Sequence, residues 1–309
     1  MEEQSFPMEN WAPLAGRWGF QGSTVKYVGP LNSPPTGLPF GLAITNLKLR
    51  SGHISSKVIL PENPRENSGR LLFGYNAETR SYLTSGIGGY NVQYVLDEFI
   101  EARGWRAIAA AGYVANIPEQ SAEFNIDTYV RGQRISVLVD RVQVIVHSLP
   151  RPIDGDQIGL FAWGPGPVLF ENPRATSRQP TAFVVMQFGE PYDSLYTEVI
   201  KPVVQAKGLI PYRVDEVYRP GIILQDITSG IIEAEVVIAE ITPPNPNVFY
   251  ELGFSHAVAK PTILLAERGK ELPFDIKGFR CIFYDNTIKG KKDVEVNLQR
   301  HLASILQEP

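Results

Sequence analysis

Short stretches in which apolar and polar residues alternate dominate the first 170 residues. Glycine, proline, asparagine and serine separate them, and the clearest run over residues 41–49, 52–60, 69–75, 123–130, 134–139 and 157–163. Alternation with a period of two is typical of strands that bury one face. Asp140 and Arg141 stand between two such patterns and are expected at a hairpin turn. Regularly spaced short strands predict an all-β sandwich.

The pattern changes after residues 173–180, a polar segment bracketed by prolines that we interpret as a linker. It divides the chain into a domain of residues 1–172 and a domain of residues 181–309. Apolar runs with the length of buried strands follow, over 182–187, 209–214, 235–241, 261–266 and 280–284. Apolar residues recur at helical spacing between and after them, over 195–204, 222–232, 249–258 and 294–306. Strands that alternate with helices predict a flavodoxin-like, five-stranded parallel sheet with helices on both faces.

Composition places the chain among ordinary globular proteins. Hydrophobic residues make up 43% and charged residues 20%, and the formal net charge is -4. This charge indicates neither direct nucleic-acid binding nor attraction to an anionic membrane. A single cysteine, no apolar run long enough to span a bilayer and an acidic start without a signal-peptide core favour a cytoplasmic protein. The four histidines are scattered without metal-ligand spacing, so neither a metal site nor a bound cofactor is expected.

Polar residues gather in three loops that follow successive predicted strands of the second half. The loops comprise residues 187–193, 215–221 and 245–251. Because ligands bind at the carboxyl edge of an open parallel sheet, we expect these loops to line one pocket. Aromatic rings suit a purine or pyrimidine, and a cation or a helix N-terminus suits a phosphate. The ring and cation candidates are Phe188, Tyr192, Tyr218, Tyr250 and Arg219.

Glu251 is the residue of greatest chemical interest. A helix expected to begin at Phe249 places it in the first turn. Such a carboxylate is either a helix-start charge stabilised by the helix dipole or a working group. Glycosyl chemistry develops positive charge on the anomeric carbon, which a fixed carboxylate stabilises. Asp226, Asn245 and Asn247 leave the same choice open, since acidic and asparagine residues are common in first turns and loops.

Four segments of the second half, residues 183–189, 226–231, 234–240 and 247–253, resemble the nucleoside 2-deoxyribosyltransferase-like family, which is close in architecture to bacterial TIR-like domains. The resemblance implies that Glu251 is the nucleophile and that Asp226 contacts the nucleoside. Asn245 stands where the transferases often have aspartate, and the loop of Gln187, Phe188 and Gly189 lines the sugar and phosphate side. It also implies a homo-oligomer, because the family's site is sometimes shared between subunits.

Two departures from the family bear on the reaction. The residues that complete the transferase site near the C-terminus cannot be placed in this chain. The long loop 215–221 resembles versions fused to other domains in bacterial signalling and antiviral defence. The resemblance therefore implies a hydrolase or transferase acting on the N-glycosidic bond of a nucleoside or nucleotide, an NADase included. The alternative is a non-catalytic nucleotide sensor in which the sandwich is the recognition domain.

The first half, over residues 11–172, resembles concanavalin/laminin-G-like sandwiches of the 3-keto-disaccharide hydrolase-like family. Trp105 and the segments 125–132, 135–140, 155–160 and 168–172 carry the resemblance. It implies a glycan or a protein as ligand of the sandwich. No pair of acidic residues has a spacing that suits hydrolysis, so no active site is assigned to this half. Its tryptophans are expected in the core more than on a sugar-binding platform.

Overall fold

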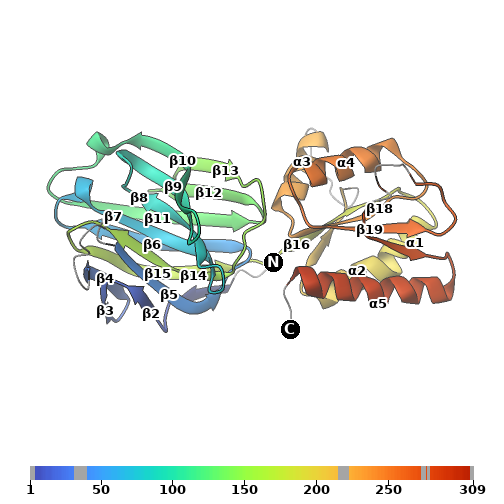
Figure 1. The fold of residues 1–309 in the computed structure, drawn as a ribbon, viewed down its shortest axis with the longest axis horizontal. Helices are drawn as coiled ribbons and strands as arrows, with labels where there is room; N and C mark the ends of the chain where they lie inside the picture. The colour runs from blue at the N-terminus through green and yellow to red at the C-terminus, as the bar shows by residue number, and fades with distance from the viewer. Residues whose placement is uncertain (1–3, 31–39, 215–222, 273–275, 277–278, 307–309) are drawn as a thin grey trace. The chain divides into compact units, whose positions relative to one another are not determined.

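The computed structural model describes residues 4–30, 40–214, 223–272, 276 and 279–306, which form two compact units (Figure 1). Met1–Ser148 and Ile153–Arg178 belong to the first unit, and Gln179–Pro309 form the bulk of the second. The first is an antiparallel β-sandwich and the second an α/β domain, as the sequence predicts.

Two sheets make up the sandwich in the part of the chain that the structure describes. The eight-stranded sheet has the order β13 (Val142–Ser148), β12 (Arg134–Val139), β11 (Ala122–Arg131), β6 (Gly52–Leu60), β15 (Val168–Ser177), β4 (Thr24–Gly29) and β3 (Arg17–Gln21), with β1 (Gln4–Pro7) paired to β15. The seven-stranded sheet has the order β10 (Gly104–Tyr113), β9 (Val92–Ile100), β8 (Ser81–Ile87), β7 (Ser68–Asn76), β14 (Gln157–Trp163), β5 (Phe40–Lys48) and β2 (Ala12–Ala15). Two short 3₁₀ helices, η1 (Pro64–Glu66) and η2 (Val114–Asn116), lie in connecting loops.

The inner faces of the two sheets meet in a close-packed core. A Cβ atom on Gly69 of β7 would lie 2.4 Å from Val58 of β6, so these two strands approach too closely for a larger residue. Ser85 of β8 hydrogen-bonds Thr128 of β11 across the interface at 2.7 Å.

Every residue of β8, a strand of the seven-stranded sheet, is buried. A strand buried on both faces shows no alternation, which is why the pattern did not reveal β8.

The predicted linker is largely strand. Residues 173–177 belong to β15 and pair with β1 and β6. The register of β15 against β6 shifts between Glu171 and Arg174, and Asn172 has a φ of 49°. An asparagine in the left-handed region followed by proline therefore forms a β-bulge, a feature that shares its residue types with loops. The hairpin expected at Asp140 and Arg141 is present, with φ values of 48° and 67°.

The second unit holds a parallel sheet with the order β17 (Ile210–Tyr212), β16 (Thr181–Val185), β18 (Val236–Glu240), β19 (Thr262–Glu267) and β20 (Cys281–Tyr284). One face packs against α1 (Tyr192–Leu195), the π-helical turn η3 (Tyr196–Ile200), α2 (Lys201–Ala206) and α5 (Ile288–Ile305). The other face packs against α3 (Ile223–Glu233) and α4 (Pro246–Ala257) (Figure 1). The predicted sheet with helices on both faces is confirmed.

Candidate functional site

The strand order of the second unit has one switch point along the carboxyl edge of the sheet. β17 lies on one side of β16 and β18 on the other, so the chain leaves β16 and β18 in opposite directions. Ligands of open α/β sheets bind at such a switch point. The loop that begins at Met186 and the segment that begins at Ile241 flank it. These are the segments that carry Gln187, Gly189 and Glu251.

Helix α4 begins earlier than the sequence pattern indicates. Asn245 is its N-cap, because the backbone N–H of Asn247 donates to the Asn245 side-chain oxygen at 2.9 Å. Pro246 takes the first helical position, where its missing N–H costs nothing. Glu251 is therefore in the second turn, and the expectation that it lies in the first turn is wrong. The helix dipole acts mainly within the first turn, so a helix-start charge no longer explains Glu251.

The carboxylate of Glu251 is half-buried and has no hydrogen bond or ion pair with any residue that the structure describes. It lies on the same side of α4 as the buried Val248, Leu252 and Ser255. Burial alone raises the pKa of Glu251 to about 7. A carboxylate kept from water without a partner destabilises the fold, and such groups cluster at functional sites.

The loop after β16 is fixed by ionic and aromatic contacts. Asp193 accepts from the backbone N–H of Gly189 at 3.1 Å and from the Arg213 guanidinium at 2.8 Å. The same guanidinium lies 5.4 Å from the ring of Phe188 and 4.4 Å from that of Tyr196. Gly189 has a φ of 99°, which a larger residue would adopt only with strain. The loop thus leaves Phe188 half-exposed, at 52%, above a buried cation.

Arg213 was missed as a site candidate. It follows β17 directly and is buried, whereas the predicted cation, Arg219, lies outside the described residues. The signal in the sequence was a charge at the carboxyl end of an apolar strand run. Glu240, the last residue of β18, carries the same signal and was also missed.

Glu240 is a buried carboxylate held by three hydrogen bonds. It accepts from the backbone N–H of Thr242 at 2.7 Å, from the Thr242 hydroxyl at 2.6 Å and from the Tyr284 hydroxyl at 2.9 Å. Burial outweighs these bonds and raises its pKa to about 7. By the alternation of β18, Glu240 points to the face covered by α1 and α5, away from α4. Its hydrogen bonds hold Thr242 and Tyr284 in place on that face, and it does not form a pair of carboxylates with Glu251.

Tyr192, predicted to bind substrate, is a core residue. It is only 7% exposed and packs with α5 and the strands of one sheet face. Burial, followed by the charges of Glu240 and Glu267, raises the pKa of its hydroxyl. The physical reason is helical phase, because α1 begins at Tyr192 and turns this ring inward. Its predicted role as a pocket wall therefore has no support in the packing.

Asp226, Asn247 and Tyr250 lie on α3 and α4, the two helices on the sheet face that carries Glu251. Asp226 is half-buried in the first turn of α3, and α3 packs against α4. Tyr250 and Asn247 are exposed, and Gln187 is half-exposed. His256 stacks on Phe279 with ring centroids 4.5 Å apart, a packing contact.

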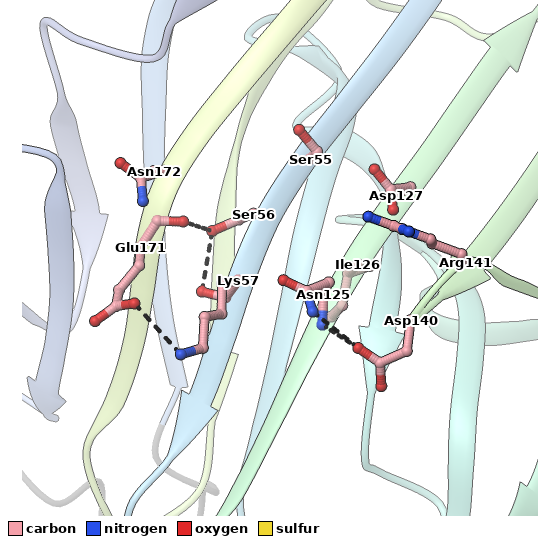
Figure 2. Close-up of a pocket in the computed structure, with 10 residues that line it drawn as sticks. All are labelled: Ser55, Ser56, Lys57, Asn125, Ile126, Asp127, Asp140, Arg141, Glu171 and Asn172. Carbon is pink, nitrogen blue, oxygen red and sulfur yellow. Dashed lines mark hydrogen bonds and ion pairs between the residues drawn. The ribbon is translucent and has the colours of Figure 1, made fainter.

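The sandwich carries a polar groove of about 670 Å³ on its eight-stranded sheet, between β6, β11 and β15 (Figure 2). Most of its charged groups are engaged by neighbouring side chains. Lys57 contacts Glu123 at 2.7 Å and Glu171 at 3.7 Å, and Asp140 accepts from the amide of Asn125 at 3.0 Å. Carboxylates engaged in this way are not poised as an acid–base pair.

Within the described ranges, no three His, Cys, Asp or Glu side chains converge to hold a metal ion. No helix in that part of the chain has the length and apolar character needed to cross a membrane.

Comparison with known proteins gives likeness of fold alone. No family model matches the chain, and no curated protein matches it. Among solved structures, the carbohydrate-binding module CBM66 from Bacillus subtilis is 16% identical over 54% of this chain and 96% of its own, with a TM-score of 0.44. The galectin LEC-6 from Caenorhabditis elegans is 12% identical over 50% and 96%, with a TM-score of 0.32.

The CMP N-glycosidase BcmB from Clostridium botulinum is also similar, at 19% identity over 38% of this chain and 98% of its own, with a TM-score of 0.32. All three identities are below 20%, and all three TM-scores are below 0.5. At such values the likeness says nothing of the substrate of this chain.

Proposed function

We propose that the second unit cleaves the N-glycosidic bond of a nucleoside or nucleotide, NAD included, and that Glu251 is the carboxylate that meets the anomeric carbon. One observation carries the proposal. Glu251 is half-buried and unpartnered among the described residues, and it belongs to α4, the helix that follows β18 beside the switch in strand order. Its burial stays unfavourable in the free protein and is offset once a positive charge develops beside it.

The reaction needs few groups from the protein. The bond between C1′ and the base nitrogen breaks, the base leaves with the bonding electrons, and positive charge forms on the sugar ring. Glu251 either stabilises this charge or bonds to C1′. Water then adds its oxygen to C1′ and gives up one proton. The departing base of a nucleoside takes up that proton, whereas nicotinamide leaves NAD as a neutral molecule and the proton passes to solvent. If the nitrogen of a second base adds instead, the reaction is a transfer.

The neighbouring residues have roles that follow from where they lie. Asp226, in the first turn of the helix packed against α4, would position or protonate the base. Gln187, the half-exposed ring of Phe188 and the backbone of Gly189 would hold sugar or phosphate. Tyr250 and Asn247 are accessible to a ligand. The side-chain oxygen of Asn245 is already engaged as the helix cap, which gives this residue a structural role.

A second candidate function is nucleotide recognition without turnover. The pKa of about 7 for Glu251 favours it, because a large share of the side chain is then protonated at neutral pH. A protonated carboxyl group is a poor nucleophile, yet it can donate a hydrogen bond to a base. The second unit would then be a nucleotide-binding sensor module, and the sandwich would be the recognition domain of the same protein.

The experiment is an incubation of the full chain with NAD, deoxynucleosides and nucleoside monophosphates, followed by chromatography of the free base. Glu251→Gln is compared with Glu198→Gln, which removes a carboxylate from an exposed ion pair with Lys291. Release of a base by the wild type and by Glu198→Gln, but not by Glu251→Gln, supports cleavage. Equal activity in Glu251→Gln, or no base from any substrate, rejects it. Saturable binding of an intact nucleotide then supports the second candidate.

A further inference from the structure

The outer face of the seven-stranded sheet holds a pocket of about 570 Å³, within the size range of small-ligand sites. Gly69 of β7 faces the opposite sheet, so its neighbours Ser68 and Arg70 face outward. Six side chains give the pocket its character: Arg70 and the rings of Phe40, Tyr90, Trp105, Phe161 and Trp163. They come from β5, β14 and β7, which are neighbours in the sheet, from the edge strand β10 and from the turn between β8 and β9.

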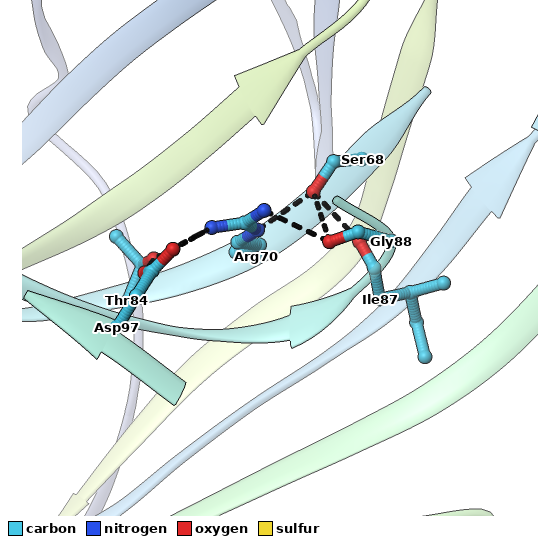
Figure 3. A network of polar contacts seen from close by, with 6 residues as sticks. All are labelled: Ser68, Arg70, Thr84, Ile87, Gly88 and Asp97. Carbon is cyan, nitrogen blue, oxygen red and sulfur yellow. Dashed lines mark hydrogen bonds and ion pairs between the residues drawn. The ribbon is translucent and has the colours of Figure 1, made fainter. Parts of the chain in front are cut away.

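The floor of the pocket is a buried network around Arg70 (Figure 3). Its guanidinium donates to the Ser68 hydroxyl at 2.7 Å, to the Gly88 carbonyl at 2.8 Å and, through a short ion pair, to Asp97. Thr84 also donates to Asp97. The positive charge of Arg70 and the negative charge of Asp97 compensate each other, so the floor is polar but carries no net charge. It therefore does not call for a ligand that is itself charged.

The rim is aromatic and open to solvent. Tyr90 is 53% exposed, Phe40 45% and Trp105 38%, although large apolar side chains are usually buried. Among the described residues, the indole N–H groups of Trp105 and Trp163 have no hydrogen-bond partner. The pocket therefore combines apolar faces with unused donors, which suits a ligand that has both C–H faces and oxygen acceptors.

The turn that carries Tyr90 is strained. Gly88, Gly89, Tyr90 and Asn91 all have positive φ values, of 79°, 102°, 51° and 60°. Glycine and asparagine accept this conformation, but a bulky tyrosine rarely does. A Cβ atom on Gly89 would lie 2.1 Å from the Arg70 guanidinium, so this turn is closed directly over the floor. Strain of this kind persists mainly at ligand clamps and active sites.

The arrangement of the rings discriminates among ligand classes. A cation is disfavoured because Arg70 already lies 5.9 Å from the Tyr90 ring and 5.4 Å from the Phe161 ring. A flat base stacks best between parallel rings. Phe40 and Phe161 are nearly parallel, at 19°, but their centroids are only 6.2 Å apart, which leaves no room for a base between them. Trp105 meets Phe161 at 63°. Rings inclined in this way form a bowl, which fits a puckered sugar ring better than a plane.

We propose that this pocket binds one pyranose unit of an uncharged carbohydrate. The C–H face of the sugar would lie against Trp105, with Tyr90 closing over it. The sugar hydroxyls would accept from the free indole groups and exchange hydrogen bonds with the amide of Asn91. The binding does not depend on the chemistry proposed for the second unit.

The test is calorimetry and tryptophan fluorescence on the full chain. The probes are the methyl glycosides of glucose, galactose and mannose, and β-1,3-linked and β-1,4-linked glucose and galactose tetrasaccharides. Trp105→Ala is matched with Trp11→Ala, because Trp11 stacks on Phe20 outside the pocket. Tyr90→Ala is matched with Tyr113→Ala, because Tyr113 is exposed and lies outside the pocket lining.

Saturable binding of at least one probe, weakened about tenfold or more by Trp105→Ala and Tyr90→Ala but not by the matched variants, is the expected result. Glu251→Gln is expected to bind the same probe as well as the wild type. Absence of binding by every probe at millimolar concentration overturns the proposal. Equal binding by the Trp105 and Tyr90 variants, or displacement of the probe by nucleosides, also overturns it.

Discussion

The backbone N–H of Asn247 donates to the side-chain oxygen of Asn245 at 2.9 Å, and this bond marks where α4 begins. Because α4 begins at Pro246, Glu251 lies in the second helical turn and not in the first, where it was predicted. Stabilisation of a helix-start charge by the helix dipole therefore does not explain this carboxylate. The same bond makes Asn245 a residue whose structural and ligand-binding roles can be separated by substitution.

Asn245→Ala is expected to lower the free energy of unfolding by about 1 kcal/mol, because the N-terminal N–H groups of α4 lose their acceptor. Asn245→Asp keeps the acceptor and is expected to retain most of the stability. Thermal unfolding of both variants measures the difference. If Asn245 also contacts the substrate, Asn245→Asp will raise KM even though it folds normally. An alanine variant as stable as the wild type would contradict the capping role.

Periodicity was sufficient where a strand or helix buries one face. β6 and β12 have the predicted bounds, and the hairpin at Asp140 lies where it was expected. It failed for β8, because a strand buried on both faces has no alternation. The Asn–Pro pairs at Asn172 and Asn245 were interpreted as linker and loop, although one is a bulge and the other begins a helix.

Part of the candidate site in the second unit could be predicted from the alternation of strands and helices, not from the periodicity of single elements. Loops that follow neighbouring parallel strands leave the same edge of a sheet, so the segments of Gln187 and Glu251 could be expected near one another, and β16 and β18 do pair in parallel. The burial of a charge is not visible in a sequence. Arg213 and Glu240 therefore became candidates only when their partners were known. Tyr192 was assigned to the pocket because the phase of a four-residue helix cannot be inferred from a loop.

The pH dependence of catalysis follows from the pKa of Glu251, which burial raises from 4.5 to about 7. The carboxylate is the form that meets a positive anomeric carbon, and its fraction increases as the pH rises through 7. We expect kcat/KM to increase about tenfold per pH unit below that point and to level off above it. The measurement is a pH profile with the substrate identified by base release. A profile that falls as the pH rises through 7 would show that the protonated acid is the active form.

Lys260 gives a prediction about how stability, rather than catalysis, depends on pH. Its buried ammonium group donates to the carbonyls of Ile232 at 3.0 Å and Ala234 at 2.7 Å, at the end of α3. Burial lowers its pKa from 10.5 to about 8. Between these two values the unfolded chain binds more protons than the folded one, so stability rises with pH there. The gain reaches about 3 kcal/mol at the upper end.

Denaturant unfolding between pH 7.5 and 10.5 tests this, with the wild type compared at each pH with Lys260→Met. The difference between them is expected to grow in favour of the wild type as the pH rises. Lys292→Met, which removes an exposed ammonium group paired with Glu295, is the control and should show no such trend. A constant difference between the wild type and Lys260→Met would mean that Lys260 has an ordinary pKa.

Gly230 lets α3 rest directly on the sheet beside the proposed site. A Cβ atom there would lie 2.6 Å from the ring of Phe183 and 3.1 Å from that of Tyr212. Gly230→Ala is expected to destabilise the fold by about 1–3 kcal/mol, because the two rings already pack together. It would also shift α3 and, with it, Asp226.

Gly253 of α4 provides the matched control, since a Cβ atom at this exposed helical position meets nothing within 4 Å. Gly253→Ala is expected to stabilise the helix by about 0.5–1 kcal/mol. Thermal unfolding separates the two variants by the sign of the change. If Asp226 positions the base, Gly230→Ala will also raise KM below its unfolding temperature, while Gly253→Ala will not. A Gly230→Ala variant with unchanged KM would therefore show that the position of α3, and hence of Asp226, does not matter for substrate binding.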